Sequence, residues 1–253
     1  MNVTKRFILP DCTIEYERRG DGVPMVVLHP SSGVRVTRAI QALSGQFSVY
    51  QPIFPGFDGT VAPAGPVSVK ALATWVAAFL STILDIPAIL VGHSFGGWVA
   101  AWVALTRPEL VGTLILQSPL GFGDLAPAPA TASPAEVLAR TYSHPEKRVD
   151  DARPEEMLTQ NRTLARSYGQ GLTKDEELIE QWPALQVPTL VLYGENDGLV
   201  QRSGLEAAVS RSSTSVLKIV QDAAHHIESD QPKQYVDLIA QFVARKTRNT
   251  FVA

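Results

Sequence analysis

The chain has little of what marks several special classes of protein. Its 253 residues include one cysteine, Cys12, so an internal disulfide is impossible and a reducing compartment is the simpler expectation. The 22 basic and 25 acidic residues leave a formal charge of −3, with no basic surplus to attract nucleic acid. These scarcities exclude a disulfide scaffold and argue against a nucleic-acid-binding protein.

Long apolar runs are also lacking. The most apolar region, residues 72–91, is interrupted by polar side chains and by Pro87, whereas a membrane span needs about 20 mainly apolar residues. Near the start, the apolar run at residues 7–9 is too short for the core of a signal peptide. We therefore expect a cytoplasmic protein without a membrane segment.

What the sequence does contain is a regular alternation of two patterns. Short apolar runs bounded by turn residues predict strands at residues 7–9, 13–16, 25–28, 47–50, 88–91, 112–116, 189–193 and 215–220. Helical spacing of apolar residues predicts helices at residues 69–84, 98–106 and 232–245. Strands that alternate with helices indicate an α/β fold with a mostly parallel sheet.

One stretch, residues 122–182, interrupts this alternation. It has no convincing strand, and prolines follow Ser133 and Arg153 where helices are predicted to begin. We interpret it as a helical cap inserted into a core formed by residues 1–121 and 183–253. A disordered linker is the alternative, but Tyr142 and several leucines give the stretch something to bury.

The candidate nucleophile is Ser94, in Gly92-His93-Ser94-Phe95-Gly96. A serine hydroxyl is a weak nucleophile at pH 7 and needs a base, exposure and a place for the oxyanion. A sharp turn from a strand into a helix exposes the side chain and directs the following amide at the reacting oxygen. The predicted strand at 88–91 and helix at 98–106 provide such a turn.

These residues resemble a known family. Residues 91–98 are similar to the nucleophile elbow of the α/β-hydrolase superfamily, and residues 107–116 resemble the segment after the elbow in esterase-like members. Similar landmarks run from about Val23 to Phe242. The resemblance implies an α/β-hydrolase fold, with a mostly parallel central sheet flanked by helices.

The resemblance also implies a base and an acid. In the family's last loop the catalytic histidine precedes a proline by seven positions, which makes His225 the match to Pro232 and leaves His226 as the second candidate. Asp197 lies in what resembles the acid loop, where it would accept a hydrogen bond from the imidazole. Glu195 and Asp124 are alternative acids, and Asp222 is expected to cap a loop.

For the oxyanion hole, the family pattern indicates the amides of Ser31 and Phe95. Pro30 stands where relatives usually have glycine, so the geometry of its loop is the open question. Four further residues are predicted to line the substrate pocket, although His29 is better suited to a structural role: His29, Ser32, Trp98 and Phe122.

The reaction expected from these residues is hydrolysis of a small or medium carboxylic ester through an acyl-enzyme. C–C bond hydrolysis of a β-diketone-type substrate is an alternative that would use a polar or cationic group of the cap, for which Arg140, Arg162 and Arg166 are candidates. Lactonase and perhydrolase activities stay open, as does a non-hydrolytic binder. No cofactor is expected, and no metal, because His225-His226-Ile227-Glu228 lacks a third ligand at a plausible spacing. The expected partner is a small-molecule substrate, and the chain is expected to be a monomer or homodimer.

Overall fold

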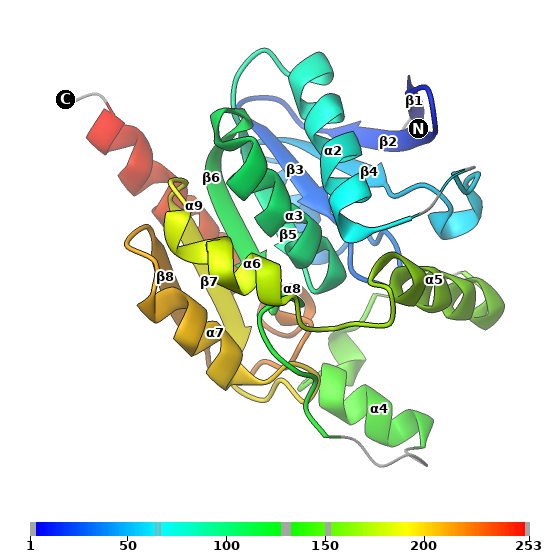
Figure 1. Cartoon of the computed structure of the whole chain (residues 1–253). Coiled ribbons are helices and arrows are strands. Elements are labelled where there is room, and N and C mark those ends of the chain that lie inside the picture. Colours follow the sequence, from blue (N-terminus) through cyan, green and yellow to red (C-terminus); the bar gives the residue numbers. More distant parts are fainter. Residues whose placement is uncertain (1–3, 64, 66, 128–132, 150–152, 251–253) are drawn as a thin grey trace.

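The computed structural model describes residues 4–63, 65, 67–127, 133–149 and 153–250, which are built around an eight-stranded sheet (Figure 1). The strands are β1 (Lys5–Ile8), β2 (Thr13–Arg19), β3 (Pro24–Leu28), β4 (Ser48–Ile53), β5 (Ala88–His93), β6 (Val111–Gln117), β7 (Thr189–Gly194) and β8 (Ser215–Val220). Their order is β1-β2-β4-β3-β5-β6-β7-β8. β2 pairs antiparallel with β1 and with β4, and the remaining neighbours are parallel, so the expected mostly parallel sheet is confirmed.

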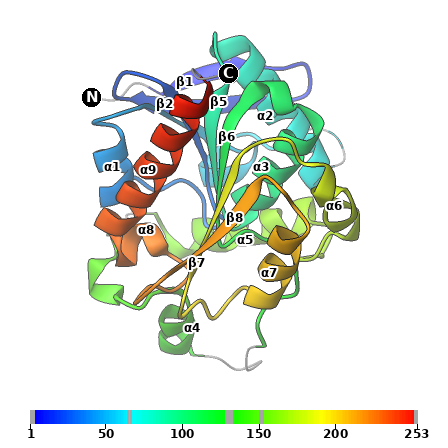
Figure 2. The ribbon, with the colours of Figure 1, turned by 90° about the vertical axis from the view of Figure 1, so that its left-hand side faces the viewer.

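Helices cover both faces of the sheet (Figure 2). They are α1 (Arg38–Leu43), α2 (Val69–Ile83), α3 (Phe95–Thr106), α4 (Pro134–Thr141), α5 (Glu155–Tyr168), α6 (Glu176–Gln181), α7 (Arg202–Ser210), α8 (Ile227–Asp230) and α9 (Pro232–Thr250). Four single turns of 3-10 helix, η1 (Phe57–Gly59), η2 (Pro108–Leu110), η3 (Pro145–Lys147) and η4 (Trp182–Ala184), join them. α1 and α9 lie on one face, and α2 and α3 lie on the other.

The central strands are buried on both faces, as their continuous apolar runs predict. In β3, Met25 and Val27 pack with α1 and α9, whereas Val26 and Leu28 pack with α2 and α3. All five residues of β3 and all six of β5 are buried. This alternation fixes the register of the sheet, because a shift by one residue would exchange the two faces.

The chain between β6 and β7 contains α4, α5 and α6 and no named strand among its described residues. α4 and α5 lie at the end of the sheet to which the arrow of β7 points (Figure 1). The predicted helix starts are found there: Ser133 caps α4 in a reciprocal capping box with Glu136, and α5 begins directly after Pro154. Residues 128–132 and 150–152 of the predicted cap lie outside the described residues.

Several elements differ from the prediction at their ends, and four helices were not predicted. α3 begins at Phe95 rather than Trp98, so the helix follows Ser94 directly. α1, α6, α7 and α8 have nine residues or fewer, too few to show a clear helical period. Among the helices of the described ranges, none combines the length and the apolar character that a membrane crossing requires.

Candidate active site

Ser94 occupies a strained turn between β5 and α3. Its backbone has φ 53° and ψ −113°, in a region that a residue with a side chain rarely adopts. Neighbouring glycines make room for this turn, because a side chain on Gly92 would overlap Gly97, and one on Gly97 would press against Pro119. The carbonyl of Ser94 accepts hydrogen bonds from Trp98 at 3.2 Å and Leu120 at 3.0 Å. The predicted strand–serine–helix turn is therefore present, and the carbonyl of Ser94 is bonded both to α3 and to the chain after β6.

The two amides predicted for an oxyanion hole belong to adjoining segments. A side chain on Gly96 would overlap the carbonyl groups of Leu28 and His29, so the first turn of α3 packs directly on the end of β3. Ser31 follows in a turn that Gly33 closes by donating to the carbonyl of Pro30 at 3.0 Å. The amides of Ser31 and Phe95 donate no hydrogen bond to any residue that the structure describes. Both amides are thus without a protein acceptor in the part of the chain that the structure describes.

Pro30 is bonded into this loop through its carbonyl oxygen, which accepts from Gly33 and from His29. The Nδ1 atom of His29 donates to the carbonyl of Pro30 at 2.8 Å, and its Nε2 atom accepts from the amide of Phe54 at 3.1 Å. These two bonds select the neutral imidazole with its proton on Nδ1. Burial lowers the pKa of His29 to about 4, so the ring stays neutral. His29 therefore links the loop at Pro30 to the backbone of Phe54, directly after β4.

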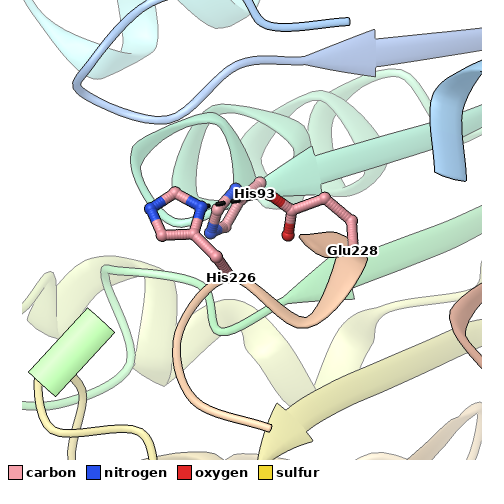
Figure 3. Close-up of side chains that lie close together, drawn as sticks. All are labelled: His93, His226 and Glu228. Carbon is pink, nitrogen blue, oxygen red and sulfur yellow. Dashed lines mark hydrogen bonds and ion pairs between the residues drawn. The ribbon is translucent and has the colours of Figure 1, made fainter. Parts of the chain in front are cut away.

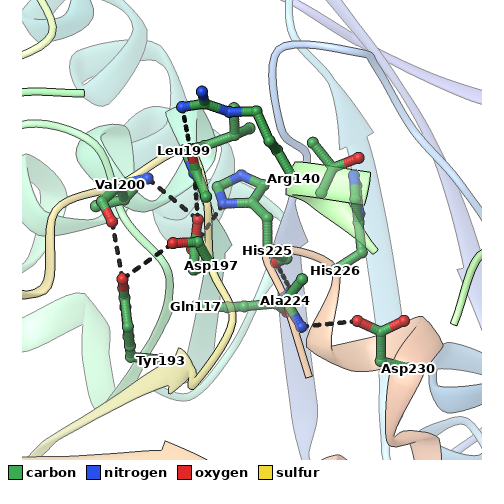
Figure 4. A network of polar contacts seen from close by, with 12 residues as sticks. Gln117, Arg140, Tyr193, Asp197, Leu199, Val200, Ala224, His225, His226 and Asp230 are labelled. Carbon is green, nitrogen blue, oxygen red and sulfur yellow. Dashed lines mark hydrogen bonds and ion pairs between the residues drawn. The ribbon is translucent and has the colours of Figure 1, made fainter. Parts of the chain in front are cut away.

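A carboxylate and an imidazole meet at the ends of β7 and β8. Nδ1 of His225 lies 2.9 Å from Oδ2 of Asp197, and both side chains are buried (Figure 4). The other oxygen of Asp197 accepts from the amides of Leu199 at 2.8 Å and Val200 at 3.1 Å. Burial opposes ionisation of Asp197, but the charge and the hydrogen bond of His225 outweigh it and lower the pKa to about 2. The carboxylate is therefore ionised and orients the imidazole.

The loops that carry this pair pack against each other through their backbones. A side chain on Gly194 would overlap the carbonyl groups of Ala223 and Ala224. The amide of Asn196 donates to the carbonyl of Ala223 at 2.9 Å. Asp197 and His225, 28 positions apart, are consequently held in register by main-chain contacts.

Gln117 connects the serine turn with the histidine loop. Its backbone carbonyl accepts from the amide of Ser94 at 2.9 Å, and its side-chain Nε2 donates to the carbonyl of His225 at 3.1 Å. The side chain is buried at the carboxyl end of β6, between β5 and β7. Gln117 was not among the residues predicted from the sequence; its one signal is a polar side chain ending the apolar run Leu114-Ile115-Leu116.

His226, which follows His225 directly, bonds to a different carboxylate, that of Glu228. Nδ1 of His226 lies 3.0 Å from Oε1 of Glu228, and its ring stacks on Tyr142 with centroids 4.3 Å apart. Gln117 donates to the other oxygen of Glu228. Burial would raise the pKa of Glu228, but His93, His226 and Gln117 keep it below its usual value, whereas burial lowers the pKa of both histidines. Glu228 is thus an ionised, buried carboxylate to which the sequence pattern assigned no role.

The remaining predicted residues occupy varied places. Trp98 is buried and donates from Nε1 to Oδ2 of Asp175 at 2.7 Å, which ties α3 to the start of α6. The carbonyl of Ser32 accepts from Asn161 of α5 at 3.2 Å. Phe122 packs edge to face on Trp182, with centroids 4.6 Å apart, and borders a groove together with Asp124.

The alternative acids, Glu195 and Asp124, form no hydrogen bond with His225 among the described residues, and neither does Asp222, which was expected to cap a loop. Asp222 is exposed and bonds Nε2 of His144 at 2.7 Å and Nε2 of Gln231 at 2.9 Å. Glu195 accepts from the amide of Asp222 at 3.5 Å. Of the proposed acids, Asp197 is the one that the structure brings into contact with His225.

The chain after α4 is anchored to the histidine loop, residues 222–226, and to Asp230 of α8. Asp230, which is fully buried, accepts from the amides of Ala224 at 2.8 Å, Ser143 at 2.9 Å and His144 at 2.9 Å. The amide of His226 donates to the carbonyl of Thr141 at 3.0 Å. The segment 141–144 is therefore a brace for the histidine loop, and Asp230 is its central acceptor.

A second anchor links α5 to the loop after β3. Asp58, at φ 50°, accepts from the amide of Val34 at 2.8 Å and from Nδ2 of Asn161 at 2.7 Å, and it forms an ion pair with Arg153. The amide of Asp58 donates to Oδ1 of Asn161 at 3.0 Å. The turn that carries Ser31 is thus fastened to a helix of the insertion.

Comparisons with known proteins agree with this architecture. A model described as the alpha/beta hydrolase family matches residues 25–238. The chain is 27% identical to a pimeloyl-(acyl-carrier protein) methyl ester esterase from Aeromonas hydrophila subsp. hydrophila, over 91% of this chain and 99% of that relative.

Solved structures show the same fold. A meta-cleavage product hydrolase from Pseudomonas fluorescens IP01 superposes with a TM-score of 0.75 at 18% identity, covering 95% of this chain and 97% of that one. Est816, described as an N-acyl homoserine lactone degrading enzyme, superposes with a TM-score of 0.71 at 20% identity, covering 94% of this chain and 100% of that one. At these identities the likeness concerns the fold.

Proposed function

The chain belongs to the alpha/beta hydrolase family, and on that premise we propose that it is a serine hydrolase that cleaves a small or medium carboxylic ester. The observation that carries the proposal is the buried hydrogen bond between Asp197 and His225. It lies at the same end of the sheet as the strained turn of Ser94, whose φ is 53°. Gln117 bonds to both Ser94 and His225 and so ties the two positions together.

In the proposed reaction, His225 removes the hydroxyl proton of Ser94 as the oxygen attacks the ester carbonyl. Asp197 stabilises the imidazolium, and the amides of Ser31 and Phe95 bind the oxyanion. His225 then returns the proton to the leaving alcohol, which leaves an acyl-enzyme on Ser94. Water, deprotonated by His225, attacks the acyl group, and Ser94 recovers its proton as the carboxylic acid departs.

The first test is labelling with a fluorophosphonate and mapping of the modified peptide. We expect a single adduct on Ser94, and we expect Ser94→Ala to lose both the adduct and at least about 10⁴-fold of kcat on p-nitrophenyl butyrate. The matched control is Ser81→Ala, which removes an exposed hydroxyl of α2 that has no part in the proposed site. An adduct elsewhere, or turnover unchanged in Ser94→Ala, would falsify the mechanism.

The bond that is cleaved requires a separate comparison. The same enzyme should be assayed with aryl esters, with an N-acyl homoserine lactone and with a dienoate diketone. We expect the highest kcat/KM on esters, because relatives that align over nearly their whole length carry the name of a methyl ester esterase. Faster turnover of the diketone would instead assign C–C hydrolysis, and binding without turnover of any of them would assign a non-hydrolytic role.

A further inference from the structure

A buried cluster next to the candidate active site has no part in the proposed reaction. It combines His93 at the end of β5, His226 before α8, and Glu228 within α8 (Figure 3). One ring nitrogen of each histidine and one carboxylate oxygen all lie within 4.8 Å of one another. No metal was expected from the sequence, because the motif lacked a third ligand along the chain, but the fold supplies His93 from a distant strand.

The cluster leaves one polar atom unpaired. Nε2 of His93 is buried and has no hydrogen-bond partner among the described residues. The rings of His93 and His226 meet at 87°, with centroids 4.9 Å apart, and Glu228 is already bonded to His226. A buried polar group without a hydrogen-bond partner is destabilising, so a ligand that engaged this nitrogen would remove that penalty.

Two imidazoles and one carboxylate form a ligand set suited to zinc, which accepts nitrogen and oxygen donors and leaves a fourth position for water. Glu228 is buried, and its hydrogen bonds among the described residues come from His226, Gln117 and Ser229 rather than from a lysine or arginine, so a cation would also neutralise its charge. We propose that His93, His226 and Glu228 bind a divalent transition-metal ion such as Zn²⁺.

The geometry limits the strength of binding. Ligand atoms around tetrahedral zinc are roughly 3.4 Å apart, so the longest separation in the cluster must shorten by about 1.4 Å. The hydrogen bond between His226 and Glu228, 3.0 Å long, would be replaced by two bonds to the metal. Because these changes cost free energy, we expect a dissociation constant in the micromolar range, weaker than that of a structural zinc site.

A bound ion would affect the neighbouring imidazole, a consequence that rests on the proposed function, whereas binding itself does not. The rings of His93 and His225 are 4.9 Å apart between centroids. Because His225 directly precedes His226, the closing of the ligand atoms around an ion would shift the backbone that carries His225. We therefore expect Zn²⁺ to inhibit ester hydrolysis reversibly, with activity restored by EDTA.

The binding test uses Zn²⁺ in equilibrium dialysis and Co²⁺ absorption as a report on coordination. We expect one ion per chain, with affinity retained in Ser94→Ala and reduced at least tenfold in both His226→Gln and Glu228→Gln. His144→Gln is the control, because His144 is a surface histidine that contacts two carboxylates, Asp222 and Glu146. Circular dichroism establishes that each variant is folded.

The outcomes separate the two proposals. Unchanged affinity in folded His226→Gln and Glu228→Gln, or loss of the ion in His144→Gln alone, would overturn the metal site. Zinc binding by a protein that lacks ester turnover would support the site and contradict the proposed function. Ester turnover without bound Zn²⁺ at 100 μM would do the reverse.

Discussion

At the scale of single residues, the oxyanion loop offers a direct experiment, because Ser31 is proposed to act through its amide. Replacing Ser31 with proline removes that N–H, and proline is well suited to the second position of a turn such as Pro30–Gly33. We expect Ser31→Pro to lose about 10²–10³-fold in kcat on aryl esters, as for other oxyanion donors.

The control is Ser31→Ala, which keeps the amide and removes the hydroxyl. It should retain kcat within about threefold, a difference of under about 0.7 kcal/mol in the barrier. Equal losses in both variants would mean that the hydroxyl, or the loop as a whole, carries the effect.

His29 gives a prediction for pH dependence. Its folded pKa of about 4 lies below the ordinary value of 6.5, so the unfolded chain binds more protons between these pH values. Stability from this residue is complete above pH 6.5 and declines as the pH falls toward 4, by at most about 3 kcal/mol.

Urea unfolding of wild type and His29→Gln at pH 7.5, 5.5 and 4.5 measures this contribution. We expect the variant to be less stable at pH 7.5, because the bonds to Pro30 and Phe54 are disturbed, and to lose less stability on acidification. Parallel pH profiles for the two proteins would contradict the neutral, buried ring.

At the scale of elements, the brace formed by segment 141–144 predicts that the helical insertion stabilises the histidine loop. Replacing Asp230 with asparagine turns one accepting oxygen into a donor that faces amides of Ala224, Ser143 or His144. We expect Asp230→Asn to lower the free energy of unfolding by about 2–4 kcal/mol and to reduce kcat, with faster hydrogen exchange at Ser143 and His144.

Asp222→Asn is the matched control, since Asp222 is an exposed carboxylate eight positions away that also contacts the insertion through His144. Its effect on stability should stay within about 0.5 kcal/mol. If the two substitutions behaved alike, burial of Asp230 would not be what makes the brace strong.

The sequence predicted elements well where one pattern is long or isolated. β7 begins at the predicted residue, β8 matches its prediction at both ends, and α2 begins where helical spacing begins. α1 and α7 were missed because both are short, and α7 begins without a side-chain cap and contains Gly204. These short helices depend on packing against the sheet, and a local sequence pattern carries no information about that packing.

The site divides in the same way. Ser94, Asp197 and His225 lie in local motifs and could be named in advance, and the structure brings the latter two into contact. Gln117, Glu228 and Asp230 act through partners more than 80 positions away, such as His225, Gln117 and Ser143, so their surroundings follow from the topology alone.

At the scale of the whole molecule, the insertion holds the core at two separate anchors. Asp230 binds the chain after α4, whereas Asn161 of α5 binds Asp58 and Ser32 near the oxyanion loop. The anchors share no residue, so we expect the effects of Asp230→Asn and Asn161→Ala on unfolding free energy to add within about 0.5 kcal/mol.

A double-mutant cycle by urea denaturation, with kcat measured for the same variants, gives the coupling. Additivity would mean that the two loops are held independently. A coupling above about 1 kcal/mol would instead mean that the insertion unfolds cooperatively, so that loss of either anchor weakens the other.

The position of the insertion also has an evolutionary consequence. It leaves the sheet after β6 and returns at β7, and these two strands are parallel neighbours. Parallel neighbours need a crossover of at least about a dozen residues, but beyond that crossover the sheet does not set the length or shape of the connection. Lineages could replace this module wholesale and acquire new substrates while the catalytic framework is inherited unchanged.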